Sequence, residues 1–126
     1  MAQVERISIR LAVVGLSILI GGCYEGDTVC TAEARPGVVV EIRDSLSGAG
    51  RAAESTAIAV EGEFADTLRN FGDSVYSQGL TERGGTYQLT ISTPGYVVWT
   101  KEGVVIHEGE CHVETLGVVA HLQPAS

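Results

Sequence analysis

The chain has 126 residues, a formal net charge of −8 from 8 Lys and Arg against 16 Asp and Glu, and 44% hydrophobic residues. This length fits at most one domain. Only five basic side chains follow position 40, so no positive stripe could neutralise phosphates, and nucleic-acid binding is strongly disfavoured. Charged residues make up 19% of the chain, and the many Val, Ile and Leu residues argue against disorder.

The first 23 residues are organised like an export signal. Arg6 and Arg10 precede an uncharged run that starts at Leu11 and reaches only thirteen residues at Cys23. A membrane-spanning helix needs roughly 20 apolar residues. A basic segment followed by a short apolar run is instead typical of a secretory signal.

The end of this run, Leu19-Ile-Gly-Gly-Cys23, resembles the lipobox of bacterial lipoproteins. The resemblance implies that residues 1–22 are removed, that the Cys23 thiol is lipidated, and that residues 23–29 form a short tether. Tyr24 differs from the Asp that signals inner-membrane retention, so the resemblance favours the outer membrane of the bacterial cell envelope. Each buried CH₂ of a lipid chain contributes about 0.8 kcal/mol, so several chains would bind the membrane stably. An ordinary signal peptide or an uncleaved anchor is the alternative.

Removal of residues 1–22 makes the rest of the chain more acidic. Those residues hold two basic and one acidic side chain, so 6 basic and 15 acidic side chains stay, with a net charge of −9. An anionic membrane surface repels such a domain. We therefore expect the lipid, rather than charge, to hold the protein at the membrane.

The other two cysteines are an even pair in an exported protein. If Cys23 is acylated, Cys30 and Cys111 are left, and disulfides persist in the oxidising compartment that export implies. Their bridge would close a loop of about 80 residues, which the chain-entropy model credits with roughly 4.5 kcal/mol. There is no Cys-x-x-Cys, so neither a redox pair nor a zinc knuckle is indicated. Two free, buried thiols are the alternative.

Short β-branched or alternating runs predict seven strands after residue 37. In chain order they cover 38–44, 56–61, 64–68, 86–93, 96–100, 104–106 and 111–122. Polar, glycine-rich segments predict loops over 69–74 and 77–85. In the last strand the alternation changes phase near Gly117, which predicts a glycine bulge.

The alternation also predicts which side chains share a face. Tyr87, Leu89 and Ile91 alternate with polar residues in the clearest strand, and Ile58 and Val60 share one face of theirs. Seven short strands at this spacing predict an all-β fold, a seven-stranded antiparallel β-sandwich. Its core is expected to include Tyr87, Leu89 and Trp99.

Two adjacent segments carry a resemblance to a known family. Gly85-Thr-Tyr-Gln-Leu-Thr-Ile91 followed by Thr93-Pro-Gly-Tyr96 resembles the signature of carboxypeptidase regulatory-like domains, and the likeness covers residues 30–122. Such domains are transthyretin-like (prealbumin-like) β-sandwiches with Greek-key, Ig-like topology. The resemblance implies a non-catalytic domain over 30–126 of the kind usually attached to a peptidase, a receptor or a surface protein. It also implies a bridge between a Cys near the first strand and one near the last, here Cys30 and Cys111.

Candidate catalytic motifs are incomplete. His107-Glu-Gly-Glu110 matches the H-x-x-E of zinc carboxypeptidases and His112-Val-Glu114 matches the H-x-E of zinc deaminases. A zinc site needs converging ligands, and no Pro-Cys-x-x-Cys follows the second motif. There is also no Gly-x-Ser-x-Gly nucleophile elbow. We therefore expect surface or strand histidines, no enzyme activity, no cofactor and no metal.

An acidic cluster offers a different interpretation. Glu61, Glu63 and Asp66 could hold calcium, although three carboxylates without a loop signature more often form a solvated strand edge. The loops around residues 62–84 could alternatively bind a glycan. Aromatic side chains suited to stacking on sugars are Tyr76, Tyr96 and Trp99, of which two are expected in the core.

We therefore expect a non-catalytic, monomeric lipoprotein of the bacterial cell envelope. Its lipid would bind the membrane, and its sandwich would act as a structural or protein-binding module for an envelope protein or a glycan. The alternative is a small glycan- or calcium-binding surface protein.

Overall fold

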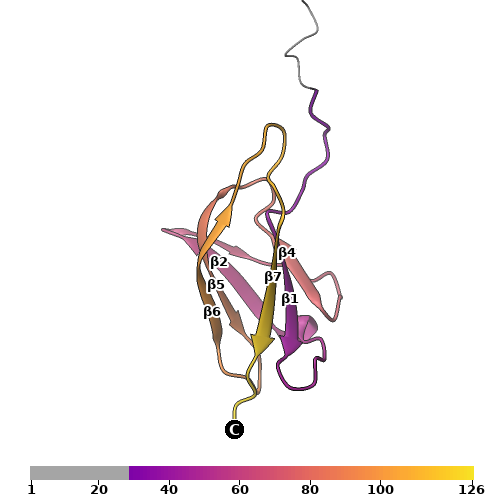
Figure 1. Ribbon diagram of the computed structural model, residues 1–126, viewed down its shortest axis with the longest axis vertical. Helices are drawn as coiled ribbons and strands as arrows, with labels where there is room; N and C mark the ends of the chain where they lie inside the picture. Colours follow the sequence, from indigo (N-terminus) through magenta and orange to yellow (C-terminus); the bar gives the residue numbers. More distant parts are fainter. Residues whose placement is uncertain (1–28) are drawn as a thin grey trace, which may run out of the picture.

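The computed structural model describes residues 29–126 (Figure 1). The signal segment, the lipidation site predicted at Cys23 and most of the tether lie outside the described residues. Within residues 29–126, no helix has the length and apolar character needed to cross a membrane.

Seven strands within residues 29–126 form two sheets, as expected for an all-β sandwich. The three-stranded sheet has the order β4-β1-β7, with β1 at Val38–Asp44, β4 at Tyr76–Gly79 and β7 at Leu116–Leu122. The four-stranded sheet has the order β3-β2-β5-β6, with β2 at Thr56–Glu61, β3 at Phe64–Thr67, β5 at Gly85–Ser92 and β6 at Trp99–Ile106. A short 3-10 helix, η1 at Ala52–Glu54, joins β1 to β2 across the sheets.

One strand pair makes the expectation of a wholly antiparallel sandwich wrong. β1 and β7 run parallel, with Val38 opposite Leu116 and Asp44 opposite Leu122 (Figure 1). A parallel pair needs a long crossover connection, and here the five other strands lie between β1 and β7 in the sequence. The first and last strands are thereby joined side by side along their whole length.

The core lies between the two sheets. On β5, Tyr87, Leu89 and Ile91 are each 1% exposed, which confirms the face predicted from their alternation. Trp99 is only half-buried and packs against the edge of the core. The other buried apolar side chains are Val38, Val40, Ile42, Ala52, Ala57, Ala59, Leu68, Leu80, Val104, Ile106, Val113, Val118, Ala120 and Leu122.

The face of β2 that meets the core consists of alanines, not of the larger residues. Ala57 lies opposite Ile91 and Ala59 opposite Leu89, and directly opposed residues share a face. The small methyl groups leave room for the bulky β5 side chains. Val60 is therefore on the outer face, 38% exposed. Since Ala, Ile and Val are all apolar, the alternation could not say which face turns inward.

The seven strands are divided differently from the prediction. Residues 99–100 and the segment 104–106 belong to a single strand, β6, whereas residues 96–98 of the predicted strand 96–100 precede it. The register of β6 against β5 shifts between Tyr87 and Leu89. Gly103 has a φ of 67° at this irregularity, so a bulge inside one strand replaces the break expected between residues 100 and 104. The number of strands in the described residues is still seven, because β4 forms in part of the segment where a loop was expected, residues 77–85.

The last strand is shorter than expected. β7 begins at Leu116, and from there Val118, Ala120 and Leu122 face the core. The residues from Cys111 to Thr115 precede the strand instead of forming its first half. The change of phase near Gly117 therefore marks the start of the strand, and the predicted bulge there is wrong.

Candidate functional site

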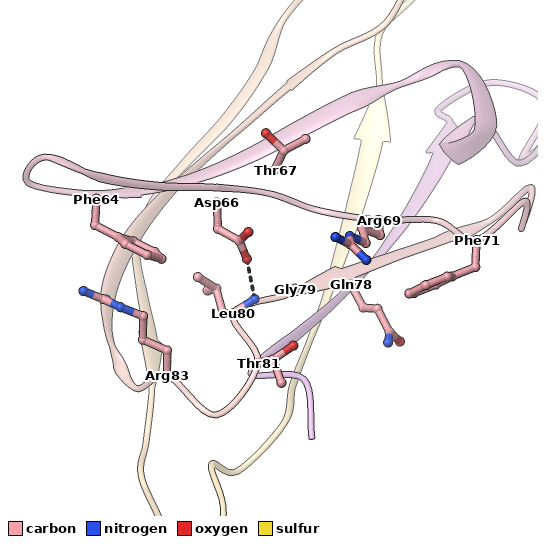
Figure 2. Close-up of a pocket in the computed structure, with 10 residues that line it drawn as sticks. All are labelled: Phe64, Asp66, Thr67, Arg69, Phe71, Gln78, Gly79, Leu80, Thr81 and Arg83. Carbon is pink, nitrogen blue, oxygen red and sulfur yellow. Dashed lines mark hydrogen bonds between the residues drawn. The ribbon is translucent and has the colours of Figure 1, made fainter. Parts of the chain in front are cut away.

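A groove of about 500 Å³ opens where the edge strands β3 and β4 approach each other from the two sheets (Figure 2). We call it the β3–β4 groove. Its lining comes from β3, β4 and the loops beside them: Phe64, Asp66, Thr67, Arg69, Phe71, Gln78, Gly79, Leu80, Thr81 and Arg83. All ten residues lie within the stretch 62–84 that the glycan interpretation singled out.

The floor of the groove is where β3 and β4 are held together. Arg69 and Gln78 exchange two backbone hydrogen bonds of 2.8 Å, and the amide of Leu80 donates to Asp66 Oδ2 at 2.8 Å (Figure 2). Gly79 permits this approach, because a Cβ at that position would overlap Leu68 Cδ2. The groove is closed at its floor by these contacts between the β3 and β4 segments.

One end of the groove is a rigid aromatic and cationic cluster. The Arg83 guanidinium lies 3.7 Å from the centre of the Phe64 ring. Its Nη1 donates to Glu61 Oε1 at 2.9 Å and to the Tyr87 hydroxyl at 2.7 Å. The Glu61 carboxylate also accepts the amide of Thr86, and this bond and then Arg83 hold the pKa of Glu61 below its usual value. Arg83 is thus fixed in place by partners around it.

The other end presents an exposed ring. Phe71 is 73% exposed and has a φ of 51°, a backbone conformation that bulky residues seldom adopt. Asn70 holds this turn, since its Oδ1 accepts the amide of Gly72 and its Nδ2 donates to the carbonyl of Ala52, both at 2.8 Å. Asp73 Oδ1 then accepts two following amides. Side-chain hydrogen bonds therefore fix a loop that displays Phe71 beside the groove.

Arg69 carries an uncompensated charge in the groove. Of the six basic side chains in residues 29–126, four have a carboxylate or phenol partner; these four are Arg35, Arg43, Arg51 and Arg83. Arg69 and Lys101 form no ion pair or side-chain hydrogen bond with the described residues. In a chain of net charge −8, an exposed and unpaired guanidinium in a groove is available to an anionic group.

The acidic cluster predicted from the sequence is not gathered into one site. Glu61 pairs with Arg83, Asp66 accepts the Leu80 amide, and Glu63 lies exposed in the turn between β2 and β3. Across residues 29–126 there is no group of three or more His, Cys, Asp or Glu side chains arranged to hold a metal ion. The three carboxylates of the predicted cluster therefore do not converge on a common point.

The disulfide between Cys30 and Cys111 is present, with a Cα–Cα distance of 5.2 Å. It confirms the predicted pairing and joins the segment before β1 to the loop before β7. This bridge ties the end of the tether to the folded domain.

His112 lies beside the bridge and makes contacts that the sequence did not reveal. Its Nδ1 lies 2.5 Å from Glu82 Oε2 and its Nε2 lies 2.9 Å from Thr31 Oγ1, and its side chain is only 10% exposed. The hydrogen bond from His112 is the largest of the causes that lower the pKa of Glu82. Glu82 also accepts the amides of Arg35 and Val113. The neighbouring Cys111 is a signal in the sequence by which this fixed histidine could have been found.

The order hydroxyl, imidazole, carboxylate in this cluster is also that of hydrolase triads. Its surroundings oppose such chemistry. Thr31 Oγ1 also donates to Glu33 Oε1 at 3.3 Å, and the hollow beside His112 is lined by Glu33, Glu82, Glu108 and Glu110. Four carboxyl groups would destabilise the oxyanion that acyl transfer creates. The cluster fits a structural role, in which it fastens the Cys30 segment to the domain.

The comparisons with known proteins give no family. The sequence matches no protein-family model, and a search of curated proteins finds none similar to it.

Proposed function

We propose that this protein is a non-catalytic lipoprotein of the bacterial cell envelope whose β-sandwich binds an envelope protein in the β3–β4 groove. The observation that carries the proposal is the combination, in one groove, of the unpaired Arg69 and the exposed Phe71 ring. Aromatic and arginine side chains are the residues most enriched at the energetic centres of protein interfaces.

The carboxypeptidase regulatory-like identity of the sandwich belongs to this proposal. Its support is the seven-stranded division into two sheets, the Tyr87, Leu89 and Ile91 face, and the bridge of Cys30 to Cys111. The transthyretin-like topology is proposed on the same grounds.

The anchor is proposed at Cys23, with the outer membrane as its location. Seven residue steps separate Cys23 from Cys30, and an extended chain of that length spans at most about 25 Å. The disulfide would therefore keep the sandwich close to the membrane surface. Labelling with radioactive palmitate tests the anchor, because Cys23→Ser should abolish incorporation; label that persists in this variant contradicts it.

Site-specific photo-crosslinking in cells tests the groove. A photoreactive residue in place of Thr81 should give a discrete adduct with another envelope protein. The matched control is Val119, which is 49% exposed on the outer face of β7 and is separated from β4 by β1 in the three-stranded sheet. Equal adducts from both positions, or none from Thr81, would refute a partner in the groove.

A glycan in the same groove is the second candidate. The exposed Phe71 ring could stack on a sugar, and Arg69, Gln78 and Thr81 could donate hydrogen bonds to its hydroxyl groups. A glycan array separates the two candidates. Binding that is lost in Phe71→Ala, without a protein adduct from Thr81, would favour the glycan.

A further inference from the structure

The β3–β4 groove exposes the unused edge of β3. Ala59 lies opposite Asp66 in the pairing of β2 with β3, and the amide of Leu68 donates to the carbonyl of Ala57. In an antiparallel pair, every second residue bonds the neighbouring strand and the residues between them point the other way. The backbone groups of Ala65 and Thr67 therefore point away from β2.

The chain begins to pair with this edge and then leaves it. Arg69 continues the alternate series of Ala65 and Thr67, so its backbone groups also point away from β2. It exchanges both of its backbone hydrogen bonds with Gln78 of β4. The next pair in that ladder would be Thr67 with Leu80. Leu80 instead has a φ of 56°, its amide donates to Asp66 Oδ2, and its carbonyl accepts the amide of Gly37 at 3.0 Å.

From this edge we infer that the β3–β4 groove binds an extended, acidic peptide segment, which pairs with the backbone of Ala65 and Thr67 and places a carboxylate on Arg69. This inference rests on the proposed function and names its mode. Addition of a strand to an exposed sheet edge is a common way of recognising peptides.

Charge selects an acidic peptide over a basic one. The groove holds the guanidinium groups of Arg69 and Arg83 against the single carboxylate of Asp66, which already accepts the Leu80 amide (Figure 2). Arg83 is held by Glu61, so Arg69 is the group left to bind an incoming carboxylate. Backbone pairing distinguishes a peptide from a glycan, because a sugar cannot continue the β3 ladder.

The probe is a fluorescent peptide of alternating valine and glutamate, capped at both ends, titrated into the detergent-solubilised mature lipoprotein. We expect saturable binding. Arg69→Glu should weaken it by at least about tenfold, because a charge-assisted hydrogen bond is lost. Lys101→Glu is the matched control: it changes the other unpaired basic side chain, on β6, and should leave the affinity within about twofold.

Two further measurements test the backbone pairing. A peptide methylated on alternate amide nitrogens should bind at least about tenfold more weakly, because it cannot donate to β3. Bound unmodified peptide should slow hydrogen exchange of the Ala65 and Thr67 amides by about tenfold or more. A lysine version of the peptide should not bind.

The inference would be overturned if the peptide did not bind at about 1 mM, or if Arg69→Glu and Lys101→Glu weakened its binding equally. It would also be overturned if the N-methylated peptide bound as tightly as the unmodified one, or if bound peptide protected amides outside β3. A protein adduct from Thr81 together with any of these results would leave the proposed function standing while removing strand addition as its mode. If the peptide bound tightly but Thr81 gave no protein adduct, strand addition would stand as a binding mode, while the proposed envelope-protein partner would be refuted. Binding of an acidic glycan that depends on Arg69 without protecting Ala65 and Thr67 would also count against strand addition.

Discussion

The hydroxyl of Tyr96 donates a hydrogen bond of 2.5 Å to Asp44 Oδ2, which joins the turn after β5 to the last residue of β1. Arg51 Nε donates to the same hydroxyl at 2.9 Å, and Asp44 Oδ1 accepts the amides of Leu46 and Ser47 at 2.7 and 2.9 Å. The two sheets are thus connected at the end of the sandwich opposite the disulfide. The tyrosine of the Thr-Pro-Gly-Tyr segment contributes a cross-sheet bond as well as a partly buried ring.

Removal of this hydroxyl should make the protein less stable and change its response to acid. The Tyr96 bond, followed by the bonds from Ser47 and Leu46, lowers the pKa of Asp44 from 3.8 to about 2. Because the folded pKa is depressed, the stabilisation is complete above pH 4 and is lost as the pH falls toward 2. Tyr96→Phe should lower the melting temperature by a few degrees at pH 6.

Thermal melts between pH 2 and 6 measure this effect. The difference between wild type and Tyr96→Phe should shrink below pH 4, where Asp44 becomes protonated in the unfolded chain. Tyr76→Phe is the control, since Tyr76 is 46% exposed on β4. A difference that stays constant down to pH 2 would contradict the role assigned to the Tyr96–Asp44 bond.

The disulfide should supply a large share of the stability. Replacement of both Cys30 and Cys111 by Ser should reduce the free energy of unfolding by about 2–5 kcal/mol, because the unfolded chain regains the freedom of a long loop. Urea denaturation of both forms measures the loss. Reduction of the wild type should reproduce it, and a variant as stable as the oxidised protein would show that the bridge adds nothing.

The contact between His112 and Glu82 should stabilise the fold at pH values where the Glu82 carboxyl group is ionised. Hydrogen bonds from His112, Arg35 and Val113 lower the pKa of Glu82 from 4.5, so their stabilising effect is present above that value and is lost as the pH falls through the folded pKa. Glu82→Gln should lower the melting temperature at pH 6 more than at pH 3. Glu54→Gln, an exposed change in η1, is the matched control and should have little effect at either pH.

Much of the fold follows from local pattern, and the errors have identifiable causes. The Tyr87, Leu89 and Ile91 face was predicted correctly, because polar residues between them leave one choice of inward face. The polar Tyr76–Gly79 segment gives no such signal, yet it forms β4 because it pairs with β1. The parallel neighbour of β1 depends on contacts between the two ends of the domain, which strand periodicity does not encode.

The candidate site was only partly predictable for a similar reason. Its position within residues 62–84 followed from loop composition. The groove itself depends on two strands from different sheets that meet at Gly79. The unpaired charge of Arg69 depends on how the carboxylate and phenol groups of the fold are distributed among the other basic side chains. Pairing of charges across the fold is a tertiary property, so the sequence pointed to the acidic residues instead.

Gly79 should be essential to the floor of the groove. Gly79→Ala places a methyl group against the Leu68 side chain and 2.9 Å from Asp66 Oδ2, so these two side chains must shift to make room for it. We expect a loss of about 1–3 kcal/mol in the free energy of unfolding, as for other overpacked sites. Gly117→Ala is the control, since a Cβ there meets nothing within 4 Å. Equal stability of the two variants in urea would show that the approach of β3 to β4 is not tight.

The inward face of β2 can be tested by a pair of neighbouring substitutions. Ala59 is 0% exposed and lies opposite Leu89, whereas Val60 is 38% exposed on the outer face. Ala59→Leu should therefore cost about 1–3 kcal/mol, because the extra carbons must displace the packed side chains of β5. Val60→Thr should change the free energy of unfolding by less than about 0.5 kcal/mol, since Thr also favours strands and the site meets solvent. Urea denaturation of both variants separates the two faces. If Val60→Thr proved the more damaging change, β2 would be turned over and the small residues would lie outside.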